Sequence, residues 1–363
     1  MDGRPARKYH ERMSILTTTL GAFPKPACLP EFDWFQSDGG PDTAHPTARY
    51  AEAIREMGEE AERLFCEAAA QVIADQVEAG IDIVTDGEVR RENYIYYHCR
   101  NLAGFDFENL TEQDVRGGNY RAFLPTIRSD VKALGAFLPH DFEAAQAVSA
   151  KPVKVTLPGP MTIGDSVADA HYGDPVTRGA ALAEAINVEV RRLAEAGCKH
   201  IQIDEPLFAR KVTDALDYGL LHLERCFEGC PDDVLRTAHM CCGYPDALDV
   251  PDYPKAPKNC YFELAEALDG SSVQAISIED AHRPNDLSLL SMFKRTTMIF
   301  GVVAIAKSRV ESPDEIAARL RAALRHIDAE RLIAAPDCGL GLLGRDLALA
   351  KLRNMAEAAH AVG

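Results

Sequence analysis

The chain has 363 residues, and its 56 acidic side chains outnumber its 39 Lys and Arg side chains to give a formal net charge of −17. A hydrophobic fraction of 47% with 26% charged residues is typical of a globular protein with a sizeable core and excludes a disordered chain. The acidic balance argues against a nucleic-acid partner, since phosphate recognition needs a positive surface. No apolar stretch approaches the roughly 18 residues of a spanning helix, and segment 1–13 lacks a signal-peptide core. These features predict a cytoplasmic protein with no membrane partner.

Short apolar runs rich in β-branched residues alternate with amphipathic helical stretches along the chain. The predicted strands are 14–19, 81–85, 153–157, 200–204, 236–240, 275–279, 297–303 and 332–335. The predicted helices include 49–79, 180–196, 312–327 and about 346–361. Gly80 and Gly197 follow the first two helices at the usual stop position. The run Ser312-Pro313-Asp314-Glu315 has the pattern of a capping box with Pro at the first helical position.

Eight strands that alternate with helices predict a parallel sheet, and eight is the number that closes a (β/α)8 TIM barrel. A doubly wound open sheet is the structural alternative. The chain contains no internal repeat and no linker-like tract. We therefore expect a single domain over residues 1–363, with its core at about 14–360, an N-terminal extension and loop insertions.

The chemistry of such a barrel lies at the carboxyl ends of its strands, where this chain concentrates His, Cys and carboxylates. His239 and Cys241 are two residues apart on one strand, so their side chains share a face. Together with Glu279 and Cys338 from other strand ends, they would give the N, S and O ligands that Zn²⁺ accepts. A buried histidine beside core cysteines is the alternative, and the presence of all four groups at strand ends favours zinc. Cys242 points the other way and is predicted to pack in the core.

A cysteine-rich zinc site has a particular chemical use. Zinc lowers the pKa of a bound thiol, so that a thiolate nucleophile exists at neutral pH, which favours thiol alkylation over water activation. The candidate ligands are spread over roughly 100 residues, unlike the compact spacing of structural zinc knuckles. The other cysteines of the ten are predicted to be thiols rather than a disulfide framework.

Three further carboxylates, Glu88, Asp204 and Glu205, fall at the predicted strand ends. They could clamp a substrate ammonium group, or they could pair with arginines at the barrel rim. The candidate rim partners are Arg90, Arg91 and Arg210. A nearby cluster either lines the mouth of the barrel or covers its helices, and it consists of Tyr94, Tyr96, Tyr97 and His98.

Seven segments in this order resemble the catalytic barrel of the cobalamin-independent methionine synthase family, to which the epoxyalkane:coenzyme M transferases also belong. They are TTTLGAFPKP, DIVTDGE, LPGPMT, IQIDEP, HMC, ISIED and PDCGL, and the resemblance covers about residues 14–359. The resemblance implies a (β/α)8 barrel that holds zinc through His239, Cys241, Glu279 and Cys338. It also implies that Glu88 and Asp204 bind the amino group of homocysteine, and that Leu20, Gly21 and Ala22 lie near its carboxylate.

The departures from the family concern the folate donor. Full-length members carry a second barrel that helps to hold polyglutamyl folate, and no such barrel is expected in these 363 residues. The tryptophan on which the pterin stacks is replaced within 163–166, and the acidic Asp-x-His of the seventh strand aligns with 304–306. The serine usual in the first turn is Ala22. The thiol-activating half of the site is therefore expected to be intact and the folate half eroded.

The sequence predicts a zinc-dependent thiol S-alkyltransferase that methylates homocysteine to methionine, with a donor other than methyltetrahydrofolate polyglutamate bound in the standard way. The donor is left open among a corrinoid, a simple methylated compound and a folate bound differently, and a corrinoid or methyl-carrier protein is a candidate partner. The only catalytic group named is the zinc-bound substrate thiolate.

The competing reaction is that of an epoxyalkane:coenzyme M transferase, in which a zinc thiolate opens an epoxide. Its sulfonate substrate would be repelled by carboxylates and would need a cation, for which Lys307 is the candidate. A third candidate function is a barrel that only binds zinc or a ligand, and a fourth is a use like that of porphyrinogen decarboxylases. The third predicts zinc with no exchangeable position, and the fourth leaves the cysteines unexplained.

Overall fold

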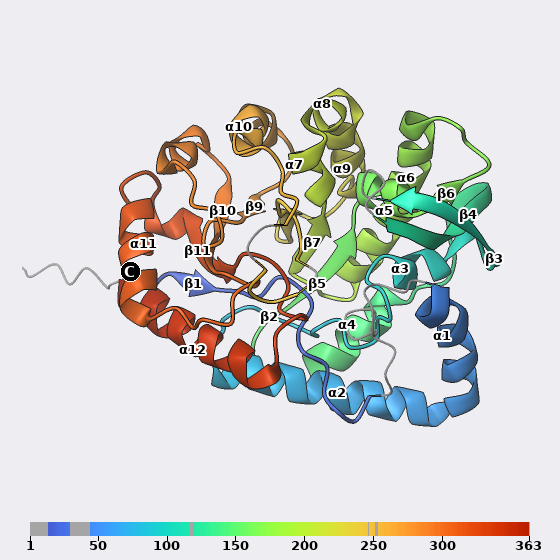
Figure 1. Ribbon diagram of the computed structural model, residues 1–363, viewed down its shortest axis with the longest axis horizontal. Coiled ribbons are helices and arrows are strands. Elements are labelled where there is room, and N and C mark those ends of the chain that lie inside the picture. Colours follow the sequence, from blue (N-terminus) through green and yellow to red (C-terminus); the bar gives the residue numbers. More distant parts are fainter. Residues whose placement is uncertain (1–13, 30–43, 116–119, 246, 251–252, 363) are drawn as a thin grey trace, which may run out of the picture.

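The computed structural model describes residues 14–29, 44–115, 120–245, 247–250 and 253–362, so the predicted N-terminal extension lies outside the described residues. Strands lie at the centre and helices surround them (Figure 1). The central strands are β1 (Leu16–Thr17), β2 (Val84–Thr85), β5 (Val153–Pro158), β7 (His200–Asp204), β8 (Leu235–Met240), β9 (Ala275–Ile278), β10 (Thr297–Val303) and β11 (Leu332–Pro336). Each of the eight predicted strands is present.

The eight strands form one parallel sheet in the order β1-β11-β10-β9-β8-β7-β5-β2. A parallel bridge between Thr18 and Ile83 joins the two ends of this order, beside β1 and β2. The backbone N–H of Ile83 also donates to the carbonyl oxygen of Thr17 at 3.0 Å. The sheet is thus a closed ring, which confirms the predicted (β/α)8 barrel and rules out the open doubly wound sheet.

Helices cover these strands and the loops that join them. They are α1 (Ala44–Met57), α2 (Glu59–Glu78), α3 (Tyr96–Arg100), α4 (Leu138–Ala147), α5 (Pro160–Ser166), α6 (Pro175–Glu195), α7 (Pro206–Arg210), α8 (Val212–Asp214), α9 (Leu220–Cys226), α10 (Cys260–Gly270), α11 (Pro313–Ala323) and α12 (Arg345–Val362). Ile201 and Ile203 of β7 join the helix-facing core, whereas His200, Gln202 and Asp204 are on the alternate face that points inward. Strand alternation therefore decides which side chains reach the barrel interior.

The prediction of one helix over 49–79 is wrong, because Gly58 separates α1 from α2. Gly58 has a φ of 55° and a ψ of −130°, a non-helical conformation that glycine adopts without a Cβ penalty. The predicted capping box is present at α11, where the Ser312 side chain accepts from the Glu315 N–H and Glu315 accepts from the Ser312 N–H. This helix ends at Ala323, four residues before the predicted boundary.

A second, three-stranded sheet was not predicted. The hairpin of β3 (Leu102–Val115) and β4 (Tyr120–Ala133) is antiparallel, and β6 (Ala168–Asp169) pairs with β4. It lies at one side of the barrel near α1 (Figure 1). Its strands carry many charged residues and two register shifts, so they lack the clean apolar alternation that marks a strand in sequence. In the part of the chain that the structure describes, no helix has the length and apolar character needed to cross a bilayer.

Candidate functional site

Three of the predicted metal ligands come together at the carboxyl ends of the barrel strands. His239, Cys241 and Cys338 each offer one ligand atom, and these atoms all lie within 4.8 Å of one another. His239 and Cys241 are buried and Cys338 is partly buried. His239 lies on the inward face of β8, Cys241 follows directly after the last residue of this strand, and the turn after β11 supplies Cys338.

Ser277 fixes the orientation of the His239 ring. Nδ1 of His239 lies 3.0 Å from Oγ of Ser277, its register neighbour on β9, and Nε2 lies 3.4 Å from Sγ of Cys338. With Nδ1 engaged by a hydroxyl, Nε2 is the nitrogen directed at the two sulfurs. The sequence reading missed Ser277, although its position two residues before Glu279 on an inward strand face was a signal that it could have used.

The two thiols of the group act on each other. A hydrogen bond from the Cys338 thiol holds the pKa of Cys241 well below its usual range, and the same bond raises the pKa of Cys338. Cys242, the neighbour of Cys241, faces away: its sulfur lies 3.3 Å from the Tyr261 hydroxyl in the core, as predicted. All ten cysteines are free thiols, which confirms that they form no disulfide framework.

The fourth predicted ligand, Glu279, is outside the group of three. Its Oε1 lies 2.6 Å from Nζ of Lys255, and its Oε2 accepts from the backbone N–H of Cys242 at 3.0 Å. Glu279 is 2% exposed, so these contacts hold a buried carboxylate beside the group. Lys255 in turn lies over the ring of Tyr253, 4.6 Å from its centroid. The sequence reading gave no role to Lys255.

Glu88 reaches the site from a strained turn after β2. Its backbone has a φ of 58°, which a residue with a Cβ seldom adopts, and it follows Gly87 at 70°. Oε1 of Glu88 accepts from Nη1 of Arg91 at 2.9 Å and from Oγ1 of Thr156 at 2.7 Å. Of the proposed rim arginines, Arg91 is thus a real partner, and the pair is buried on the inner side of the turn rather than at the rim.

The turn 20–22 lies directly against this carboxylate. A Cβ added to Gly21, whose φ is 117°, would lie 2.6 Å from Oε1 of Glu88, so only glycine permits the approach. On the other side, a Cβ on Gly339 would lie 3.1 Å from Cβ of Ala22, and the N–H of Leu340 donates to the Ala22 carbonyl at 2.7 Å. The turn after β1 therefore lies between Glu88 and the loop that carries Cys338.

Asp204 completes the inner wall at the end of β7. Its register partner on β8 is His239, and its Oδ1 accepts from Nε2 of Gln202 at 2.7 Å. Burial raises the pKa of Asp204 to about 7, the charge of Glu88 adds to this rise, and the charge of His239 opposes it. Glu205 turns away, because its carboxylate caps the first turn of α5 through the N–H groups of Met161 and Thr162.

The pKa values of two tyrosines respond to the charges of the site. Burial, followed by the charges of Asp204 and Cys241, raises the pKa of Tyr94 well above its usual value. Burial and the charge of Glu279 likewise raise the pKa of Tyr253. The rest of the aromatic cluster packs elsewhere; for example, Tyr97 donates to Asp141 at 2.8 Å. Tyr94 is thus the member of that cluster whose pKa responds to Asp204 and Cys241.

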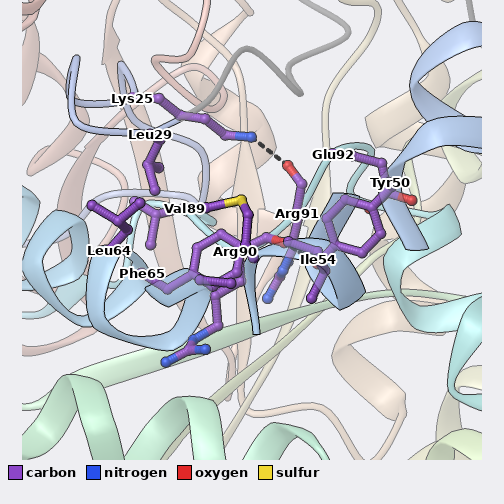
Figure 2. Close-up of a pocket in the computed structure, with 12 residues that line it drawn as sticks. Lys25, Leu29, Tyr50, Ile54, Leu64, Phe65, Val89, Arg90, Arg91 and Glu92 are labelled. Carbon is purple, nitrogen blue, oxygen red and sulfur yellow. Dashed lines mark hydrogen bonds between the residues drawn. The ribbon is translucent and has the colours of Figure 1, made fainter. Parts of the chain in front are cut away.

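A separate hollow lies behind the turn that carries Glu88 (Figure 2). Side chains of α1 and α2, such as Ile54 and Phe65, line it together with Val89, and Nζ of Lys25 donates to the carbonyl oxygen of Arg91 at 2.5 Å. None of the three grouped ligands lines this hollow. The hollow is therefore distinct from the candidate site.

The chemistry of the donor set suits zinc. An imidazole nitrogen and two thiol sulfurs, buried within 4.8 Å of one another and with one sulfur already favoured as thiolate, are ligands that zinc accepts. The Ser277 hydroxyl occupies the place of the outer hydrogen-bond partner of a zinc-bound histidine, which is more often a carboxylate, a backbone carbonyl or water. The residues present therefore fit the ion.

Comparison with known proteins identifies the family. The family model described as the catalytic domain of cobalamin-independent synthase matches residues 15–361. The chain belongs to the cobalamin-independent methionine synthase family. Family members of similar length include proteins named methionine synthase from Sulfurisphaera tokodaii, 29% identical over 93% of this chain and 90% of the relative, and from Sulfolobus acidocaldarius, 29% identical over 95% and 91%.

A solved structure from the same family agrees with the fold. It is a B12-independent methionine synthase from a Shewanella species in complex with selenomethionine, with a TM-score of 0.82 and 28% identity over 96% of this chain and 98% of the other. Family membership makes this chain an enzyme of a methyltransferase family. At the positions expected to depart from the family, Ala304 and Ala306 are buried after β10, and residues 163–166 lie within α5.

Proposed function

We propose that the protein is a zinc-dependent thiol S-alkyltransferase that transfers a methyl group to homocysteine and forms methionine. The observation that carries the proposal is the gathering of His239, Cys241 and Cys338 beside two buried carboxylates at the strand ends. A metal-thiol site alone would serve many thiols. The adjacent carboxylates favour a thiol that carries an ammonium group.

His239, Cys241 and Cys338 would hold the zinc ion, and Glu279 is the fourth ligand we propose. Its carboxylate would exchange its contact with Lys255 for the ion. Zinc bound there would keep the substrate sulfur as a thiolate at neutral pH. Ser277 would keep the His239 ring aimed at the ion.

The remaining residues would bind and align the substrate. Asp204 and Glu88 would receive the homocysteine ammonium. Within the described residues, the side-chain hydrogen bonds of the Glu88 carboxylate both go to Oε1, so Oε2 remains for the substrate. The turn from Leu20 through Gly21 to Ala22 would receive its carboxylate. Rate would come largely from holding the sulfur in line with the methyl carbon, since displacement at carbon needs close and aligned reactants.

The methyl donor would not be polyglutamyl methyltetrahydrofolate bound in the standard way. Ala304 and Ala306 offer no group that could protonate a leaving folate, and no tryptophan stands between Ile163 and Ser166 for pterin stacking. A corrinoid, a simple methylated compound or a folate bound differently would supply the methyl group. A corrinoid or methyl-carrier protein is the macromolecular partner consistent with this donor.

The epoxyalkane:coenzyme M reaction is the competing function. Its thiol substrate carries a sulfonate, which Glu88 and Asp204 would repel. Lys307, the candidate cation for that sulfonate, lies in the turn after β10 and is only partly buried. The carboxylates of Glu88 and Asp204 are therefore the feature that would favour homocysteine over the sulfonate thiol.

Calorimetric titration of zinc-loaded protein with L-homocysteine and, in parallel, with 2-mercaptoethanesulfonate tests the proposal. We expect homocysteine to bind at least tenfold more tightly. The variant Asp204→Asn should weaken homocysteine by about 1–3 kcal/mol, the cost of losing a charged partner, and leave the sulfonate thiol unweakened. If the wild type prefers the sulfonate thiol, the proposal of methyl transfer is wrong and epoxide opening takes its place as the proposed reaction.

A further inference from the structure

The interior of the barrel is divided into an apolar and a polar half. The apolar half is a separate cluster that contains Leu20, Ala275, Ile299, Ile333 and Ala335, from β9, β10, β11 and the end of β1. The polar half is built by the inward faces of β5, β7 and β8. Its members are Lys154, Thr156, His200, Gln202 and Thr237.

Four buried polar atoms in this half have no hydrogen-bond partner among the described residues: Nζ of Lys154, Nδ1 of His200, Oε1 of Gln202 and Oγ1 of Thr237. Register places Lys154 beside His200 and Gln202 beside Thr237, so the four belong to adjoining positions. A buried polar atom without a partner is costly. A polar cluster of two to four such groups is the setting in which internal water is bound.

A polar row leads from Lys154 to the candidate site. Gln202 lies one inward position beyond His200 on β7, and its Nε2 donates to Oδ1 of Asp204 at 2.7 Å. Asp204 is the register neighbour of His239, one of the three grouped ligands. At the opposite end of the row, His200 is partly exposed at the start of β7. The row therefore connects the site to the amino-terminal mouth of the barrel.

Lys154 is electrostatically coupled to both ends of this row. Burial lowers the pKa of Lys154 to about 7, and the Asp204 carboxylate opposes this lowering. Burial, followed by the charge of Lys154, lowers the pKa of His200 to about 4. On β8 the titratable group that faces it is His239. Above Thr156, Glu88 and Arg91 form an ion pair, so their charges largely cancel.

A bound homocysteine thiolate adds one net negative charge, from its sulfur, carboxylate and ammonium together. In a low-dielectric interior this charge favours the protonated form of a nearby amine. Lys154 is the buried amine available, and no carboxylate neutralises it through a hydrogen bond within the described residues.

We propose that Lys154 takes up the proton that the substrate thiol loses on binding, an inference that rests on the proposed function. The S–H bond breaks with its electron pair left on sulfur, and the proton passes by way of the Asp204 carboxylate and bridging water, past the Gln202 amide, to the lone pair of Nζ. When the neutral thioether product leaves, the proton returns to solvent past His200. Lys154 is thus a proton acceptor for substrate activation, placed inside the barrel rather than at its mouth.

The test counts protons rather than turnover. Homocysteine is titrated into zinc-loaded protein at pH 8 in buffers of different ionisation enthalpy, with the wild type and with Lys154→Met, an apolar side chain of similar length. With a free thiol pKa of about 8.5, the wild type should release almost no proton to the buffer and Lys154→Met about 0.8 per substrate bound. The matched control is Lys151→Met, which removes a half-exposed lysine that precedes β5 and pairs with Asp82 at 3.2 Å. It should release as few protons as the wild type.

Equal proton counts for the wild type and Lys154→Met, with homocysteine bound by both, would overturn this inference and leave the proposed function standing. If the wild type does not bind homocysteine, both fall. Should Lys154→Met fail to fold, the wild type labelled with ¹³C at the lysine ε carbon gives the answer. Homocysteine should shift the Lys154 resonance to its protonated position at pH 8, and an unchanged resonance would refute the proton uptake.

Discussion

At the scale of single residues, two adjacent cysteines have opposite environments. Cys241 faces the barrel interior with His239 and Cys338, whereas Cys242 faces the core against Tyr261. The alternation of a strand end is enough to cause this difference. Cys242 is therefore an internal control for the assignment of Cys241 as a metal ligand.

We expect Cys241→Ser to remove most of the bound zinc and to abolish turnover, because a serine hydroxyl is not ionised at neutral pH and is a poor zinc ligand. Cys242→Ser should keep the zinc stoichiometry of the wild type. The measurement is zinc content by elemental analysis after dialysis, with folding monitored by circular dichroism. Full zinc retention in Cys241→Ser would remove the metal assignment.

At the scale of elements, α11 shows how a local signal fixes a boundary. The reciprocal bonds between Ser312 and Glu315 satisfy two N–H groups that the first turn would otherwise leave without helix partners. Pro313 adds a backbone angle that is already helical. The start of this helix is therefore set by four consecutive residues.

Replacing Ser312 by Ala should cost about 1 kcal/mol of unfolding free energy, the usual value of an N-cap. Urea unfolding at pH 7 measures the loss. Ser312→Thr, which keeps a hydroxyl acceptor, is the matched variant and should recover most of it. A Ser312→Ala protein as stable as the wild type would show that helix packing alone determines this end.

Elements were predictable where the pattern is local or strictly periodic. All eight barrel strands and the α11 cap follow from apolar runs and capping residues, and the strand ends then marked His239, Cys241 and Cys338. The break at Gly58 depends on one backbone conformation inside a continuous apolar pattern. Lys255 could not be assigned, because its partner Glu279 lies 24 residues further along the chain.

At the scale of the whole molecule, a buried carboxyl group outside the candidate site makes the stability of the fold depend on pH. Asp141 of α4 lies 3.3 Å from Nε of Arg90 and accepts from the Tyr97 hydroxyl at 2.8 Å. Burial outweighs both partners and raises the pKa of Asp141 to about 6. The folded state thus binds this proton more tightly than the unfolded state, whose carboxyl has a pKa of about 3.9.

Stability contributed by the protonated Asp141 should be present below pH 4 and should fall as pH rises through 6, by about 3 kcal/mol in total. Asp141→Asn removes this titration. Urea unfolding at pH 4 to 7 should therefore show the wild type losing stability relative to Asp141→Asn as pH rises. Glu143→Gln, on the exposed side of the same helix, is the matched control for charge removal. A pH-independent difference between wild type and Asp141→Asn would contradict the shift.

The ring of strands closes between segments from opposite ends of the chain, since β1 pairs with β11. Cys338 follows β11 and stands 99 residues after His239. During synthesis, which delivers the amino-terminal part first, the nascent chain holds β1 long before its second neighbour exists. A ribosome-bound intermediate therefore lacks one of the three grouped ligands, and acquisition of the proposed zinc ion would be a late event in biosynthesis. Translation that stops before residue 338 yields a chain without the last thiol, however much of the barrel it contains.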